Sequence, residues 1–156
     1  MTPAIALVVE APEWRKGTAG LLPQLRRAAR LAWTHGPQKA RARNRFTILL
    51  ADDAKLKALN ADFRGKDKPT NVLSFPAQGS GPYLGDIAIA FGVTSREARD
   101  ARKPFGAHAT HLVVHGVLHL LGYDHERARE ARVMEPLEIA ILAELGIANP
   151  YAARAA

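Results

Sequence analysis

The stretch that decides the fold and the chemistry of this chain is His115-Gly116-Val117-Leu118-His119-Leu120-Leu121-Gly122-Tyr123-Asp124-His125. Residues four apart on a helix lie on one face, so His115 and His119 can reach a single ion. Gly122 is the residue type that ends a helix in the left-handed region, and the resulting turn can bring His125 to the same ion. Three imidazole nitrogens with an open fourth position are typical of a catalytic zinc site.

Two further histidines lie upstream on the same predicted helix face, His108 and His111. Only two histidines from adjacent turns can converge on one metal, because residues eight apart are separated by about 12 Å along a helix. The pair His115 and His119 lies nearest the Gly122 turn, so we assign the metal to that pair. His108 and His111 either line a polar groove or are satisfied in the core, and His111 is a candidate to support a metal ligand from behind.

Composition predicts one domain, residues 1–156, which is long enough for a real core. The chain has no cysteine, which fits a reducing compartment and excludes disulfides and thiolate metal ligands. Its first residues have no basic leader and too short an apolar run for a signal or membrane segment. We therefore expect a cytoplasmic protein without membrane association.

The net charge of +7 is unevenly distributed. Residues 1–105 carry 18 Lys and Arg against 9 Asp and Glu, whereas residues 106–156 carry 4 against 6. A basic surface next to a metal site favours a polyanionic substrate, of which nucleic acid is the commonest, although the same charges could be ordinary solvated surface. The basic residues form two clusters: Arg26, Arg27, Arg30, Lys39, Arg41, Arg43 and Arg45, and then Arg64, Lys66 and Lys68.

Apolar periodicity predicts a single α/β (α+β) domain with a small mixed four-stranded sheet packed against about five helices. The predicted strands are 4–10, 46–51, 71–75 and 86–90. The predicted helices are 17–33, about 53–62, 95–102, 105–121 and 127–145, with a basic loop-like segment after the first of them. Pro23 falls where a helix start tolerates proline, Asp52 or Asp53 is the expected cap of the second helix, and Ser95 that of the third.

The spacing His-x3-His-x2-Gly-x2-His also occurs in zinc peptidases of the metzincin type. In those enzymes a glutamate follows the first histidine and acts as general base, whereas this chain has Gly116 there. Met134 could be offered as a counterpart of their methionine turn, but a methionine in an amphipathic helix is usually a core residue. A peptidase is therefore a weak alternative.

Three segments together resemble the YbeY endoribonucleases, also called ribosomal RNA maturation factors, over residues 46–145. The first is Asn60-x2-Phe63-Arg64-Gly65-x-Asp67-Lys68-Pro69-Thr70-Asn71-Val72-Leu73-Ser74-Phe75-Pro76. The second is Leu84-Gly85-Asp86-Ile87, and the third is His115-Gly116-x-Leu118-His119-Leu120-x-Gly122-Tyr123-Asp124-His125. Position 71 is often aspartate in such sequences and is asparagine here, and residues 1–45 match only in style.

The resemblance implies a single-strand-specific endoribonuclease that acts in ribosomal RNA processing, including maturation of the 3′ end of 16S rRNA, and in ribosome quality control. It implies one zinc ion per chain, held by His115, His119 and His125, and an essential Arg64. The expected partners are single-stranded RNA, ribosomal RNA and the ribosome. Another class stays open, a metal-stabilised ribosome assembly factor with little catalysis.

The chemistry of these residue types agrees with phosphoryl transfer. Zinc is a Lewis acid for a phosphoryl oxygen, and an arginine stabilises the extra charge of the transition state by bidentate contact. We expect a basic cleft between the 105–121 helix and the Arg64 loop, with His115 and Arg64 as the catalytic residues and Lys66 and Lys68 contacting substrate. Asp86 and Asp124, with His111, are candidates for supporting roles. The sequence leaves open the general base, the nucleophile (water or the RNA 2′-hydroxyl) and the metal, since imidazoles also bind nickel and copper.

Overall fold

In a computed structural model of the chain, four strands form one mixed sheet with the order β1-β2-β4-β3. The structure describes residues 2–16, 19–123 and 128–152. Strands β1, β2 and β4 run parallel, and β3 joins β4 antiparallel at one edge. Their bounds are β1 (Ala4–Val9), β2 (Arg45–Ala51), β3 (Val72–Pro76) and β4 (Tyr83–Ala90). The mixed four-stranded sheet is thus confirmed, with β4 starting three residues earlier than predicted.

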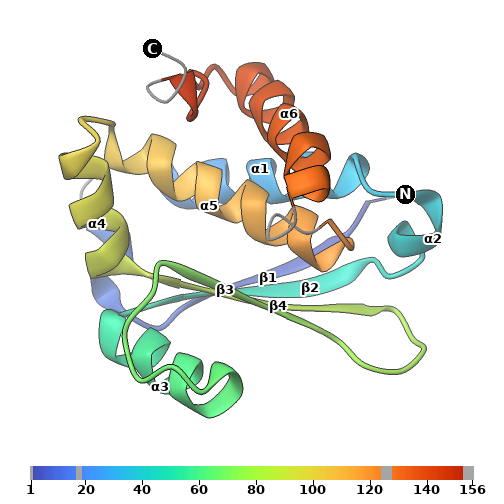
Figure 1. Cartoon of the computed structure of the whole chain (residues 1–156), viewed down its shortest axis with the longest axis horizontal. Coiled ribbons are helices and arrows are strands. Elements are labelled where there is room, and N and C mark those ends of the chain that lie inside the picture. Colours follow the sequence, from blue (N-terminus) through green and yellow to red (C-terminus); the bar gives the residue numbers. More distant parts are fainter. Residues whose placement is uncertain (1, 17–18, 124–127, 153–156) are drawn as a thin grey trace.

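The described residues form six α-helices and one short 3₁₀ helix around this sheet (Figure 1). They are η1 (Pro12–Arg15), α1 (Leu21–Thr34), α2 (Gln38–Arg41), α3 (Asp53–Arg64), α4 (Phe91–Asp100), α5 (Phe105–Leu120) and α6 (Ala128–Glu144). The five predicted helices are present. The segment expected to be loop-like contains the short helix α2, and helix α1 begins four residues later than predicted because Gly20 before it has a left-handed φ of 81°.

The start of α4 corrects the prediction that Ser95 caps this helix. The helix begins at Phe91, and the side chain of Asp53, at the start of α3, accepts a hydrogen bond of 2.9 Å from the backbone N–H of Val93. That bond satisfies one of the N–H groups that a helix start leaves free, although the residue that supplies it is 40 positions away. For α3 itself, Asp52 is the N-cap and accepts from the N–H of Lys55, as expected.

The two faces of the sheet carry different layers. Helices α1, α5 and α6 lie over one face, and α3 lies over the other (Figure 1). Ile87 and Ile89 of β4 belong to the main core under α5, whereas Ala88 and Ala90 belong to a smaller core on the α3 side. Alternation along β4 therefore places the side chain of Asp86 on the α3 face.

Helix α5 crosses the middle of the molecule and is buried on most of its sides. Its apolar residues, such as Val113, Val114 and Val117, are fully buried between the sheet and the neighbouring helices. None of the helices in the described part of the chain is long and apolar enough to cross a membrane. The polar side of α5 is its row of histidines, and these residues form the core of the candidate functional site.

Candidate functional site

Four histidines form a continuous row along one side of α5. The ring centroids of His108 and His111 are 6.3 Å apart, those of His111 and His115 are 6.4 Å apart, and those of His115 and His119 are 6.3 Å apart. The expectation that they share one helix face is thus confirmed. The third predicted zinc ligand, His125, and the neighbouring Asp124 lie outside the residues that the structure describes. Within the described ranges, no three His, Asp or Glu side chains are grouped closely enough to hold a metal.

The turn after His119 has the geometry that the sequence predicted for Gly122. Helix α5 ends at Leu120, and Gly122 has a φ of 107°, a value that L side chains rarely adopt. The N–H of Gly122 donates to the carbonyl of His119, and the N–H of Tyr123 donates to that of Leu118. These bonds close the helix and reverse the chain directly beside His119.

A buried glutamate behind the histidine row was missed by the sequence reasoning. Glu138, on α6, is fully buried, and its Oε2 lies 2.6 Å from Nε2 of His111 and 3.4 Å from Nδ1 of His115. Its other oxygen accepts a hydrogen bond of 2.9 Å from the hydroxyl of Tyr151. A glutamate on an amphipathic helix is usually exposed to solvent, so only the three-dimensional structure links Glu138 to α5.

Glu138 is ionised in this position. Burial by itself raises the pKa of a carboxyl group, but the hydrogen bonds from His111 and His115 outweigh it and lower the pKa of Glu138 from 4.5 to about 2. Because a carboxylate only accepts hydrogen bonds, the nitrogen of His111 that lies 2.6 Å from Glu138 carries a proton. The negative charge of Glu138, 3.4 Å from Nδ1 of His115, favours the tautomer of His115 with Nδ1–H toward the carboxylate.

The hydrogen-bond partner of His108 is on α4, whereas that of His111 is Glu138 on α6. Its Nε2 lies 2.9 Å from Oε1 of Glu97, and the same oxygen accepts a hydrogen bond of 3.0 Å from Nδ2 of Asn71. The hydrogen bond from His108 is the main cause that lowers the pKa of Glu97, and it outweighs the opposing effect of burial. An amide at position 71 therefore suits this site better than an aspartate would, since it donates to a carboxylate.

The groove beside the histidines differs from the basic cleft that we predicted. It has a volume of about 640 Å³ and lies between α5, α4 and the start of β3. Its described lining holds the carboxylates Glu97 and Asp100 together with His111, His115 and Tyr151, and it includes no Lys or Arg. Arg64, Lys66 and Lys68 are not among the described residues that line this groove, so its predicted basic lining is wrong.

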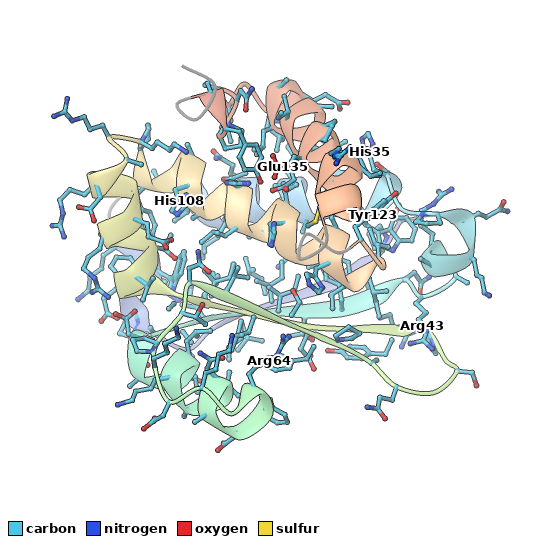
Figure 2. The ribbon with its side chains drawn as sticks, in the orientation of Figure 1. His35, Arg43, Arg64, His108, Tyr123 and Glu135 are labelled. Atoms are coloured by element: carbon cyan, nitrogen blue, oxygen red, sulfur yellow. The ribbon has the colours of Figure 1, made fainter. Side chains whose placement is uncertain are left out.

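Arg64 is the last residue of α3 and reaches that edge from the opposite face of the sheet. Its Nη2 donates to the carbonyl of Ser74 at 3.0 Å, and its guanidinium lies 6.0 Å from the centre of the Phe75 ring. The hydroxyl of Ser74 in turn donates to the carbonyl of Gly116 on α5 at 3.2 Å. Figure 2 shows Arg64 on the α3 side of the sheet and His108 on the α5 side. Edge strand β3 thus connects Arg64 with the histidine helix.

The remaining predicted side chains lie at varying distances from this edge. Lys66 and Lys68 are exposed on the loop after α3, where Asn60 holds the backbone of both residues. Asp86 bonds the hydroxyl of Tyr83 on the α3 face, so the sheet separates it from the histidines and the supporting role that we considered for it does not fit. Met134 is a fully buried core residue, as its place in an amphipathic helix indicated.

Gly116 faces the sheet and not the groove. A Cβ atom at this position would lie 2.9 Å from Cγ2 of Ile87, so α5 approaches β4 too closely for a side chain. A glutamate of the peptidase type could not act from here. Position 116 therefore cannot supply the general base that a metzincin mechanism requires.

A four-stranded mixed sheet under a histidine-bearing central helix, with an arginine at the neighbouring sheet edge, defines a small α/β protein with a histidine-centred site. The sequence profile described as Endoribonuclease YbeY matches residues 23–146, and the chain belongs to this family. The match extends further toward the N-terminus than the resemblance over residues 46–145 suggested. Membership supports an RNA endonuclease role.

Individual relatives agree with this assignment. The Endoribonuclease YbeY of Nitrobacter winogradskyi is 50% identical over 161 residues, which cover 97% of this chain and 83% of that protein. That of Rhodopseudomonas palustris strain BisB18 is 56% identical over 115 residues, covering 69% of this chain and 68% of the relative. The solution structure of TM1509 from Thermotoga maritima has a TM-score of 0.59 at 26% identity, and the match covers 90% of this chain and 91% of that one.

Proposed function

We propose that this chain is a zinc-dependent endoribonuclease that cuts single-stranded RNA, with ribosomal RNA as its substrate in the cell. The observation that carries the proposal is the pairing of His115 with the buried Glu138. A histidine whose second ring nitrogen donates to a carboxylate is the arrangement that metal-binding sites use to orient an imidazole. The proposal includes maturation of the 3′ end of 16S rRNA, ribosome quality control and a cytoplasmic location, which follow from the family resemblance.

Three imidazoles are the donor set that we infer for one zinc ion. His115 and His119 would hold it from adjacent turns of α5, and His125 would be the third ligand. Zinc bound there would supply Lewis acidity to a phosphoryl oxygen of the substrate. Glu138 would favour the proton on Nδ1 of His115, so that its Nε2 would carry the lone pair that binds the metal.

Arg64 would engage the scissile phosphate. A guanidinium has five N–H donors, and the bond to the Ser74 carbonyl uses one Nη2 hydrogen, which leaves further N–H groups for a phosphate. The guanidinium carbon also lies within cation–π range of the Phe75 ring, 6.0 Å from its centre. Lys66 and Lys68 on the following exposed loop would add counter-charge along the RNA backbone.

The test is cleavage of a single-stranded ribosomal RNA fragment, with the metal content of each protein measured in parallel. We expect wild type to cut, Arg64→Glu to bind zinc without cutting, and His115→Ala to lose both zinc and cutting. Arg99→Glu, an equal charge reversal at an exposed position of α4, is the matched control and should cut normally. Equal cutting by all four proteins would indicate a contaminating nuclease and would overturn the proposal.

The second candidate function is a metal-stabilised ribosome assembly factor with little catalysis. The observation in its favour is that Glu138, His111 and Tyr151 join α6 and the C-terminal segment to α5, so a metal on this helix would stiffen the fold. This candidate predicts that a folded His115→Ala protein still binds ribosomes and that wild type does not cut RNA. Cleavage by wild type that depends on Arg64 would exclude it.

A further inference from the structure

A second concave surface lies at the opposite edge of the sheet from the histidine site. This arginine groove runs between edge strand β1 and helix α1 and has a volume of about 530 Å³. Leu7 of β1 and Leu22 of α1 form part of its apolar floor. Its rim consists of four arginines from two elements, Arg15 of η1 and Arg26, Arg27 and Arg30 of α1.

Three of these arginines have no structural task in the described parts of the chain. No carboxylate there lies within ion-pair distance of Arg15, Arg27 or Arg30, and all three residues are exposed. Arg26 differs, because its Nη1 donates to the carbonyl of Ile5 on β1 and fixes the wall of the groove. Among the residues that the structure describes, those that line the groove include no carboxylate.

The contrast with the neighbouring basic residues is informative. Arg41 donates from Nε to the carbonyl of Gly36, and its guanidinium carbon lies 5.9 Å from the centre of the Trp33 ring. Arg43 donates to the carbonyls of Ala77 and Gly79. These two arginines hold loops of the fold. The first basic cluster of the sequence therefore contains two kinds of arginine. Some donate hydrogen bonds to backbone carbonyls, and others line the groove without a described carboxylate to balance their charge.

Guanidinium groups on a shallow apolar floor are suited to a chain of phosphates. Arg27 and Arg30 are three residues apart, so both project from neighbouring turns of one helix face. Each guanidinium can bond a phosphate in bidentate fashion, and the apolar floor can accept a sugar or a base face. Repeated positive charge without paired carboxylates is the electrostatic pattern of a nucleic-acid surface.

We propose that the arginine groove binds the phosphate backbone of the RNA substrate at a second position, away from the site of cutting. The inference deepens the proposed function and rests on it for the identity of the ligand as RNA. Strands β1 and β3 are separated by three strand spacings, or about 14 Å across the sheet, and the α1 and α5 layer lies between the groove and the histidines. Only an RNA long enough to pass around this layer can occupy both positions.

The experiment compares binding of a long and a short RNA by Arg27→Glu/Arg30→Glu and by wild type. The control, Lys57→Glu/Arg99→Glu, makes the same charge change at exposed positions of α3 and α4, away from the groove. The short RNA has about six nucleotides, near the low end of single-strand site sizes of roughly 4–16, and the long one has about 30. A thermal melt of each protein shows that it is folded.

Losing two phosphate contacts reduces the slope of log K against log salt concentration by about 1.4. Relative to about 1 M salt, this change corresponds to about 25-fold at about 0.1 M salt, so we expect the groove variant to bind the long RNA about 25-fold more weakly there. Cutting of the short RNA should stay at the wild-type rate, and the control variant should bind the long RNA close to wild type. If wild type cuts neither RNA but the groove variant still loses binding of the long RNA, the proposed function fails, whereas binding of RNA by the arginine groove is supported.

Three outcomes would overturn the inference. The first is unchanged binding of the long RNA by the folded groove variant. The second is an equal loss in the control variant, which would show a general effect of net charge. The third is competition by polyglutamate as strong as by RNA of equal charge, which would show that the groove accepts any polyanion.

Discussion

Oε2 of Glu138 lies 3.4 Å from Nδ1 of His115, so a fully buried carboxylate on α6 stands directly behind a predicted zinc ligand on α5. The same oxygen is 2.6 Å from Nε2 of His111, and the other oxygen accepts from Tyr151. The network joins α5, α6 and the C-terminal segment in one buried polar unit. A metal ligand oriented in this way needs no rearrangement of its imidazole when the ion binds.

Replacing Glu138 by glutamine should weaken zinc binding by about 10–100-fold, the range found when such supporting groups are removed. Glutamine keeps the size of the side chain but loses the negative charge that holds the Nδ1 proton of His115. The measurement is a competition titration of zinc against a chromophoric chelator. Glu144→Gln, at an exposed position at the end of the same helix, is the control and should bind zinc like wild type. Equal zinc affinity of Glu138→Gln and wild type would contradict the role of Glu138.

The stability of the metal-free protein should depend on Glu138 in acid. The folded pKa of about 2 lies below the ordinary value of 4.5, so the folded state binds the proton less readily than the unfolded state. The stability that ionised Glu138 contributes is therefore fully present above pH 4.5 and is lost as the pH falls toward 2. Urea unfolding should show a large difference between wild type and Glu138→Gln near neutral pH and a smaller one at about pH 3. A difference that grows on acidification would refute this sign.

The sequence predicts those parts of the structure that depend on local pattern. Helix α5 is predicted to within one residue, because its apolar residues and its histidines recur at helical spacing and a glycine ends it. The contacts that shape the site instead join distant residues: His111 and Glu138 are 27 positions apart, and Ser74 and Gly116 are 42. No local pattern reports such pairs, so Glu138 was missed and the lining of the groove was predicted with the wrong charge.

The cap of α4 by Asp53 can be tested by stability alone. Asp53→Ala should lower the free energy of unfolding by about 1–2 kcal/mol, because the N–H of Val93 loses its acceptor. Asp53→Asn keeps an oxygen for that N–H and loses only the charge opposite Arg96, a partly exposed pair worth at most about 1 kcal/mol. Chemical denaturation of the three proteins gives these differences. An asparagine variant as unstable as the alanine variant would mean that the ion pair dominates.

Asn71→Asp should disturb the groove by placing a second carboxylate beside Glu97. The amide of Asn71 now donates to Oε1 of Glu97 at 3.0 Å, and an aspartate there would repel it. We expect the pKa of Glu97 to rise and the free energy of unfolding to fall by about 1 kcal/mol, because the Glu97 carboxylate is partly exposed. Titration of the Glu97 carboxyl by NMR in both proteins measures the first effect. A pKa of Glu97 that stays the same or falls would show that the contact between residues 71 and 97 makes no electrostatic contribution to the ionisation of Glu97.

Gly116→Ala sets two effects against each other. Alanine in a helix interior is favoured over glycine by about 1 kcal/mol, but its Cβ would lie 2.9 Å from Cγ2 and 3.2 Å from Cδ1 of Ile87. Cγ2 branches directly from the Cβ of a fully buried strand residue, so it cannot move aside, and overpacking of this kind costs about 1–3 kcal/mol. We expect net destabilisation of about 1 kcal/mol in wild type and a stabilising effect of the same substitution in an Ile87→Ala background. A double-mutant cycle by urea unfolding measures both, and additive effects would mean that the α5–β4 approach does not require glycine.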